Sequence, residues 1–261
     1  MGSSYWCESG GAKIDGGATL EASLLFAIEL TILYAAGSNV MGRLMRISGF
    51  AGRGCVLGRM AFYLLVFPGV ILHESAHYLA CLLTRTRVTR FAPFSPGRSD
   101  DGRLVLGYVR HERRAFPIGA IIGLAPLLLN PLGLLAVTAF LTPLTFQEVA
   151  NPSVGVMAKE IFASGYVSDT PMLATTWAYL SLSFALGSVP SREDLASLPM
   201  LLLVFGGGIL LVGLLRIGSE RVFASAIYDL SALAAGLYAL PATVAAVAAL
   251  TVELAGRAVR R

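Results

Sequence analysis

Charged residues are scarce in this chain. Only 14% of its 261 residues are charged, whereas 56% are hydrophobic. A soluble domain of ordinary composition has about 25% charged residues, so this deficit excludes a soluble globular enzyme. Long apolar runs cause the deficit, and they indicate an integral membrane protein.

Other signals are also absent. The three cysteines, Cys7, Cys55 and Cys81, form no CxxC metal or redox motif. No internal repeat is visible, and basic residues do not alternate with aromatic ones, so we expect no nucleic-acid partner. The net charge of +4 comes mostly from arginines between apolar runs. This distribution indicates membrane topology and contact with the lipid bilayer.

Six apolar runs are near or above the length that crosses a bilayer, about 17–25 residues. They are Ala18–Val40, Met60–Leu83, Phe116–Leu141, Pro171–Gly187, Leu198–Leu215 and Val222–Val252. The sequence therefore predicts an all-α polytopic membrane protein with about six transmembrane helices. We expect one membrane-embedded domain over residues 1–261, with its core at about 60–195.

The segments between the spans indicate orientation. Segment 84–115 carries eight arginines against three acids, and the C-terminus ends on further arginines. The positive-inside tendency places both in the cytoplasm, with the active site toward the cytoplasmic side of a prokaryotic cell membrane. The arginines of segment 41–59 oppose this assignment, because they would face outward.

One segment has β character. Residues 87–91 and 103–109 resemble strands, and the turn-forming residues 95–102 lie between them. We therefore expect a short β-hairpin directly after the second span.

The second span contains the sequence His73–Glu74–Ser75–Ala76–His77. Residues four apart lie on one face of a helix, so both imidazoles can bind one Zn²⁺, and Glu74 can take a proton from the zinc-bound water. The bland alternative is polar contact between helices. Because ionisable residues inside a membrane span are costly and usually functional, we expect a metal. His111, the third histidine, fits a solvated loop.

A catalytic zinc needs a third protein ligand. The carboxylates near the membrane are Glu21, Glu29, Glu193, Asp194 and Asp229. We favour Asp194, which follows the helix-breaking Pro190, although Ser191 and Asp194 also have the spacing of a helix-capping box. Asp229, inside the sixth span, is the second candidate ligand, or it could orient a ligand histidine as a hydrogen-bond acceptor.

These motifs resemble the site-2 protease group of intramembrane zinc metalloproteases, peptidase family M50. The resemblance covers about residues 60–195 and rests on Pro68–Gly69, the His73–His77 turn, a β-containing loop and a later carboxylate. It implies that His73, His77 and Asp194 bind zinc and that Glu74 activates water.

The chain departs from the family pattern in its second motif. The family has an Asn-Pro-Asp-Gly or Leu-Asp-Gly sequence, whereas residues 130–133 read Asn-Pro-Leu-Gly. With Asp194 as the ligand, the chain looks like a divergent subgroup. Ala125–Pro126 with Asn130 is similar to the family's Gly-Pro and Asn, which implies that Asn130 binds substrate or the oxyanion. A kinked helix with a buried amide is the alternative.

We therefore expect a zinc metalloendopeptidase that hydrolyses membrane-embedded protein substrates. A catalytically inactive scaffold or accessory subunit of a membrane complex is the main alternative, because residue 132 is not an aspartate. An ion transporter is a third, and the lack of repeated halves disfavours it.

Overall fold

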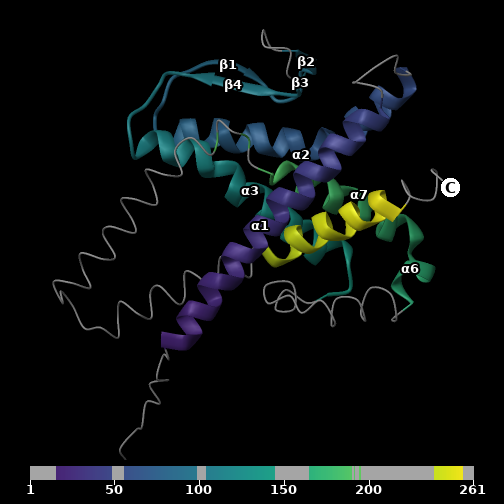
Figure 1. Ribbon diagram of the computed structural model, residues 1–261. Coiled ribbons are helices and arrows are strands. Elements are labelled where there is room, and N and C mark those ends of the chain that lie inside the picture. Colours follow the sequence, from purple (N-terminus) through teal and green to yellow (C-terminus); the bar gives the residue numbers. More distant parts are fainter. Residues whose placement is uncertain are drawn as a thin grey trace, which may run out of the picture.

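The computed structural model describes residues 16–48, 56–98, 104–144, 165–189, 191, 194 and 238–254. Most of these residues are helical (Figure 1). The elements in chain order are α1 (Gly16–Ile47), α2 (Val56–Leu83), β1 (Val88–Ala92), β2 (Gly97–Arg98), β3 (Leu104–Val105), β4 (Tyr108–His111), α3 (Ile118–Leu141), α6 (Tyr166–Asp169) and α7 (Pro171–Gly187). A last helix, Tyr238–Leu254, is called the C-terminal helix below.

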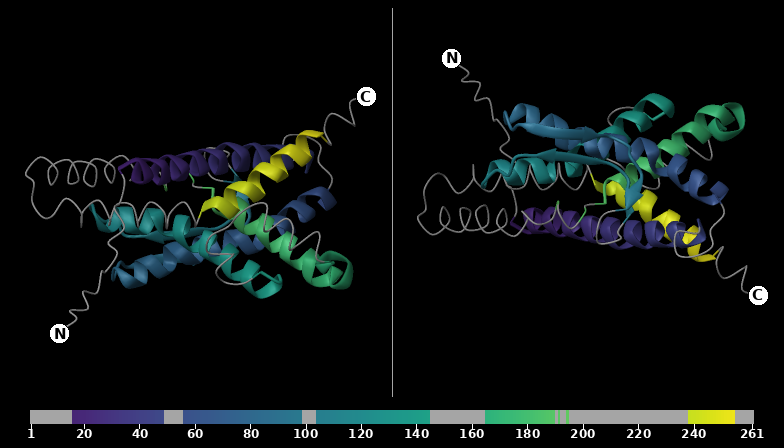
Figure 2. Two further views of the ribbon diagram at one scale, coloured as in Figure 1. Left: turned by 90° about the horizontal axis from the view of Figure 1, so that it is seen from below. Right: turned by 90° about the horizontal axis from the view of Figure 1, so that it is seen from above.

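Three helices form the centre of the described structure. Helices α2, α3 and α7 pack against one another. Helix α1 lies beside the C-terminal helix (Figure 2), where Leu33 packs against Tyr238 and Ala242. An ion pair between Arg43 and Glu253 joins the same two helices.

Four of the six predicted spans coincide with helices. Among the described residues, α2 and α3 are long and apolar enough to cross a membrane. The predicted fourth span has the bounds of α7, and the first lies within α1. The fifth predicted span lies outside the described residues, and the sixth is described only from Tyr238 onward.

A proline inside α2 fixes how this helix lies against α7. Pro68 has no N–H, so the carbonyl of Leu64 loses its helical donor. The hydroxyl of Tyr179 on α7 donates to that carbonyl at 2.7 Å. One residue after the proline, the N–H of Gly69 donates to Ser183 Oγ at 2.8 Å. Because α7 supplies hydrogen-bond partners on both sides of Pro68, α2 is held against α7 at this proline.

The predicted hairpin is present, but its ladder is interrupted. Strand β1 pairs with β4 and β2 pairs with β3, both antiparallel. Between the pairs, Pro93 lacks the N–H that a ladder needs, and the N–H of Ser95 donates to Leu106 O at 2.7 Å. The predicted strand over 103–109 is therefore divided at residues 106–107.

Aromatic contacts hold the hairpin along α2. The ring of Phe91 stacks on Tyr78, with centroids 4.6 Å apart. Further along, Phe94 meets Phe67 edge to face at 4.9 Å. Such aromatic pairs contribute about 0.5–1.5 kcal/mol each beyond the area they bury. Figure 1 shows β1 and β4 running beside α2 as a result.

Candidate metal centre

The two histidines lie on one face of α2, with ring centroids 5.0 Å apart. Each ring is fixed through its Nδ1 atom. His73 Nδ1 lies 2.8 Å from the carbonyl oxygen of Gly187, and His77 Nδ1 lies 2.8 Å from that of Ile122. A carbonyl oxygen only accepts, so Nδ1 carries the proton in both rings. In the neutral imidazole, Nε2 is then left with a free lone pair.

A close approach of α2 and α7 brings the carbonyl of Gly187 to His73. A Cβ at Gly69 would lie 2.0 Å from Ser183 O, and one at Gly187 would lie 2.6 Å from Gly69 O. Only glycine fits at both positions, because a side chain would meet backbone there. Gly187 also ends α7, where the last carbonyls of a helix have no helical donor. Its oxygen is therefore free for His73.

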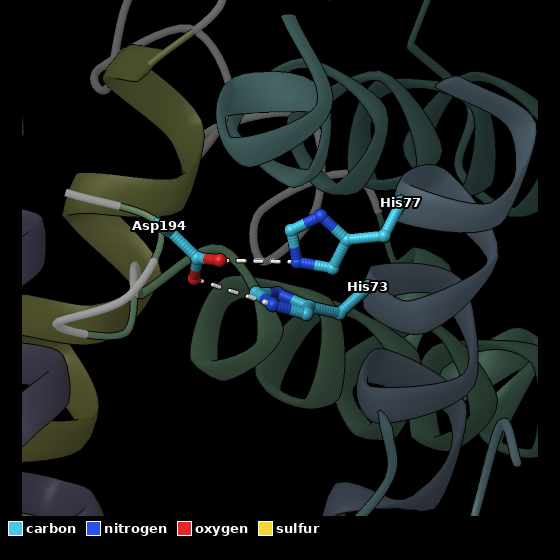
Figure 3. A group of neighbouring side chains, drawn as sticks. All are labelled: His73, His77 and Asp194. Atoms are coloured by element: carbon cyan, nitrogen blue, oxygen red, sulfur yellow. Dashed lines mark ion pairs between the residues drawn. The ribbon is translucent and has the colours of Figure 1, made fainter. Parts of the chain in front are cut away.

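Asp194 is brought to the histidines from beyond the end of α7. Its side chain is buried, with Oδ1 3.0 Å from His77 Nε2 and Oδ2 3.5 Å from His73 Nε2 (Figure 3). The carboxylate also accepts from the N–H of Ser191 at 2.7 Å, and Ser191 Oγ accepts from the N–H of Asp194 at 3.1 Å. These two reciprocal bonds form a capping box. The capping and ligand interpretations of Asp194 are therefore compatible, since the cap aims the carboxylate at the histidines.

The chemistry of this cluster favours a cation at its centre. The ligand atoms of His73, His77 and Asp194 all lie within 4.8 Å of one another. With Nδ1 protonated, each Nε2 is an acceptor, and an ionised carboxylate only accepts. Facing lone pairs in a buried place need a proton or a metal ion between them. Two imidazole nitrogens and one carboxylate oxygen are ligands that zinc takes in catalytic sites, where a fourth position stays open.

Glu74 lies against the hairpin. It follows His73 directly in α2, and its side chain is partly buried. A Cβ at Gly107, between β3 and β4, would lie 2.7 Å from Glu74 Cγ. The glycine thus lets the hairpin pass close to the glutamate, which places the segment between β3 and β4 beside the residue predicted to act as the base.

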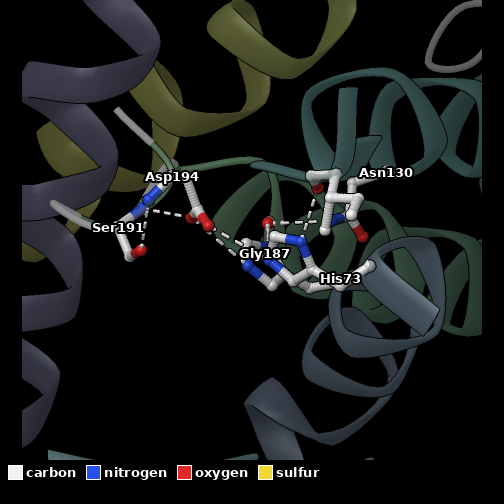
Figure 4. Close-up of polar contacts among 7 residues, drawn as sticks. His73, Asn130, Gly187, Ser191 and Asp194 are labelled. Carbon is white, nitrogen blue, oxygen red and sulfur yellow. Dashed lines mark hydrogen bonds and ion pairs between the residues drawn. The ribbon is translucent and has the colours of Figure 1, made fainter. Parts of the chain in front are cut away.

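Asn130 supports the site from α3. It is fully buried, and its Nδ2 donates to Gly187 O at 2.8 Å, the same carbonyl that fixes His73 (Figure 4). Its Oδ1 has no hydrogen-bond partner in the described part of the chain. The family resemblance implies that Asn130 binds substrate or the oxyanion, and that role stays a prediction. The observed contact is a hydrogen bond from the amide to the last residue of α7.

The remaining predicted residues are distributed as follows. His111, expected in a solvated loop, instead ends strand β4 and is partly buried; it is not part of the metal cluster, and its Nδ1 lies 2.8 Å from Glu112 O. Glu29 lies on α1 and is not in the cluster of the described residues. Asp229 and Glu193 fall outside the described residues, so the roles predicted for Asp229 stay predictions. The carbonyls of Ile122 and Gly187, which fix the two imidazole rings, are not predicted from the sequence. The available signals were Pro126, four residues after Ile122, and Pro190, which marks the end of α7.

Comparison of the chain with models of protein families, with curated proteins and with solved structures finds no match.

Proposed function

We propose that this protein is an intramembrane zinc metalloprotease that resembles the site-2 proteases. One observation carries the proposal. The histidines of a His-Glu-x-x-His turn and the carboxylate of Asp194 converge within 4.8 Å. The turn lies in α2, which is long and apolar enough to cross a membrane.

The outer surface of the helices supports a membrane location. Large apolar side chains point outward, among them Leu64 (67% exposed), Leu83 (85%), Phe140 (87%) and Met172 (83%). Such a surface is costly in water and suits lipid. We infer a multi-pass protein with about six spans in a prokaryotic cell membrane, and the arginine-rich segment 84–115 orients the site toward the cytoplasm.

The residues of the chain divide the chemistry between them. His73, His77 and Asp194 would hold the zinc ion, which supplies Lewis-acid chemistry by polarising a carbonyl and lowering the pKa of water to about 7. Glu74 takes the proton of the attacking water and then gives it to the leaving amine. Gly187 and Ile122 keep the two imidazoles in the tautomer that leaves Nε2 free.

The hairpin provides a means of holding the substrate. A helical peptide bond is hydrogen-bonded and shielded, so a membrane-embedded substrate must unwind before hydrolysis. An extended segment could add to an edge of the hairpin by main-chain hydrogen bonds. Gly107 lies against Glu74, so a strand held there would be close to the proposed base.

The test compares the wild-type protein with Glu74→Gln in cells. New N-termini inside membrane spans are mapped by mass spectrometry, and zinc is measured in both purified proteins. The proposal expects Glu74→Gln to keep its zinc and to lose the intramembrane cleavages. Equal cleavage by both proteins would overturn the mechanism.

An inactive zinc-binding scaffold is the second candidate. It is favoured by Leu132, which stands where the family's second motif has a carboxylate. Asp194 weakens this argument, because it brings a carboxylate to the histidines from another position. Stoichiometric zinc without any Glu74-dependent cleavage would support the scaffold.

A further inference from the structure

The prolines inside the long helices share a structural consequence. Proline has no N–H, so the carbonyl four residues earlier has no helical donor. Helix α2 contains Pro68, and α3 contains Pro126 and Pro131. The carbonyls that they free belong to Leu64, Ile122 and Leu127.

Each freed carbonyl accepts a hydrogen bond from a different helix. Leu64 O accepts from Tyr179 of α7, and Leu127 O accepts from Tyr238 of the C-terminal helix. These two contacts join helices and lie outside the metal cluster. Ile122 O differs, because its partner is His77 Nδ1 at 2.8 Å. Pro126, which frees the carbonyl of Ile122, therefore affects the hydrogen bond of a proposed metal ligand.

We propose that Pro126 is a positioning residue of the metal centre, which keeps His77 in the tautomer that can bind a metal. It does so by removing the N–H that would otherwise compete for Ile122 O. The inference rests on the proposed zinc site, and it extends that site to a residue that is not itself a candidate ligand.

Burial makes the competition between a backbone N–H at residue 126 and the His77 Nδ1–H for Ile122 O important. Pro126 and Ile122 are both buried, with less than 2% and 2% of their surface exposed. Water therefore has little access to Ile122 O, and the His77 side chain is itself only 14% exposed. With alanine at 126, a backbone N–H would lie on Ile122 O as in any regular helix turn. The Nδ1–H of His77 would then lose or share its acceptor.

The alternative tautomer of His77 has a ready partner. If the proton moves to Nε2, it points at Asp194 Oδ1, which lies 3.0 Å away. That hydrogen bond would satisfy both groups without a metal and would remove the lone pair that zinc needs. Loss of Ile122 O as an acceptor thus favours the metal-free state in which His77 Nε2–H donates to Asp194. Outer partners of metal-binding histidines typically contribute 10–100-fold in affinity.

The experiment measures zinc affinity of the purified full chain by chelator competition. Pro126→Ala is compared with Pro131→Ala, a matched control on the same helix whose freed carbonyl binds Tyr238 instead of a ligand. We expect Pro126→Ala to bind zinc about 10–100-fold more weakly and Pro131→Ala to bind it like the wild type. Equal affinities in all three proteins would overturn the inference.

A second variant separates the effect of the missing N–H from the effect of the proline ring. Replacing Pro126 by the α-hydroxy acid analogue of alanine gives an ester linkage, which has neither a ring nor an N–H. The inference expects this ester to keep the wild-type zinc affinity. If the ester variant binds zinc as weakly as Pro126→Ala does, the proline ring matters rather than the absent donor, and the inference is overturned.

The tautomer is read directly in the zinc-free protein from the ¹⁵N shifts of the His77 ring. We expect the Nδ1–H form in the wild type and the Nε2–H form in Pro126→Ala. The same tautomer in both would contradict the inference. A wild-type protein that binds no zinc would instead contradict the proposed function, so the two failures are distinguishable.

Discussion

Asp194 Oδ1 faces His77 Nε2 at a distance of 3.0 Å, while Nδ1 of the same ring lies on the carbonyl of Ile122. The two nitrogens of the His77 ring thus have different partners. The carbonyl fixes the proton on Nδ1, and the carboxylate meets the lone pair on Nε2. This pairing makes sense when a cation completes the contact.

Removing the proposed zinc ion should destabilise the protein. Without a cation, the acceptors of His73, His77 and Asp194 face one another. A ligand present at 100 times its dissociation constant stabilises the folded state by about 2.7 kcal/mol. We expect a chelator to lower the thermal unfolding midpoint in detergent and zinc to restore it. Magnesium prefers oxygen ligands and serves as the control. Restoration by magnesium, or no effect of the chelator, would contradict a zinc site.

Gly187→Ala should disturb both packing and metal binding. The added Cβ would lie 2.6 Å from Gly69 O, so α2 and α7 must separate, and overpacking of this kind costs about 1–3 kcal/mol. The carbonyl on which His73 depends moves with α7, so zinc affinity falls as well. The control is Gly42→Ala, where a Cβ meets nothing within 4 Å. Thermal unfolding and chelator competition compare the variants, and equal behaviour of the two would refute the close-packing argument.

Ser191→Ala tests whether the capping box aims Asp194. The change removes the acceptor for the Asp194 N–H, and loss of such a cap costs about 0.5–2 kcal/mol. We expect weaker zinc binding than in the wild type, with recovery in Ser191→Thr, which keeps the hydroxyl. If the alanine variant binds zinc as tightly as the threonine variant, the cap does not position the ligand.

Part of this site can be predicted from the sequence, because local spacing determines it. The four-residue separation of His73 and His77 places them on one helix face, and Ser191 and Asp194 have the spacing of a capping box. The apolar runs likewise predict α2, α3 and α7. In each case the relevant partners are near neighbours in the chain.

The rest depends on contacts between distant segments. A proline predicts a freed carbonyl, but not that His77, 45 residues from Ile122, will take it. The sequence predicts a hairpin with a strand over residues 103–109, but it does not predict that Pro93 and Gly107 lie together and interrupt the pairing where the chain crosses Glu74. The amide of Asn130 is buried, as one of the two interpretations from the sequence predicts. Only the packed structure identifies Gly187 as its hydrogen-bond partner.

The hydrogen bond between Tyr179 and Leu64 O in α2 makes its own prediction. Tyr179→Phe removes the donor to Leu64 O and should cost about 1 kcal/mol. In a Pro68→Ala background, the new backbone N–H takes that carbonyl, so Tyr179→Phe should cost almost nothing. A double-mutant cycle of unfolding free energies measures the coupling. Additive effects would show that Tyr179 does not compensate for the proline.

The zinc content of Asp194→Asn, compared with that of the wild type, tests the central claim most directly. Asparagine keeps an oxygen that can accept from the Ser191 N–H, so the cap and the fold should persist, but the neutral amide is a poor zinc ligand. Metal analysis of the purified full-length proteins should find one zinc per wild-type chain and far less in Asp194→Asn. A zinc-free wild type, or equal zinc in both proteins, would contradict a metal centre built from His73, His77 and Asp194.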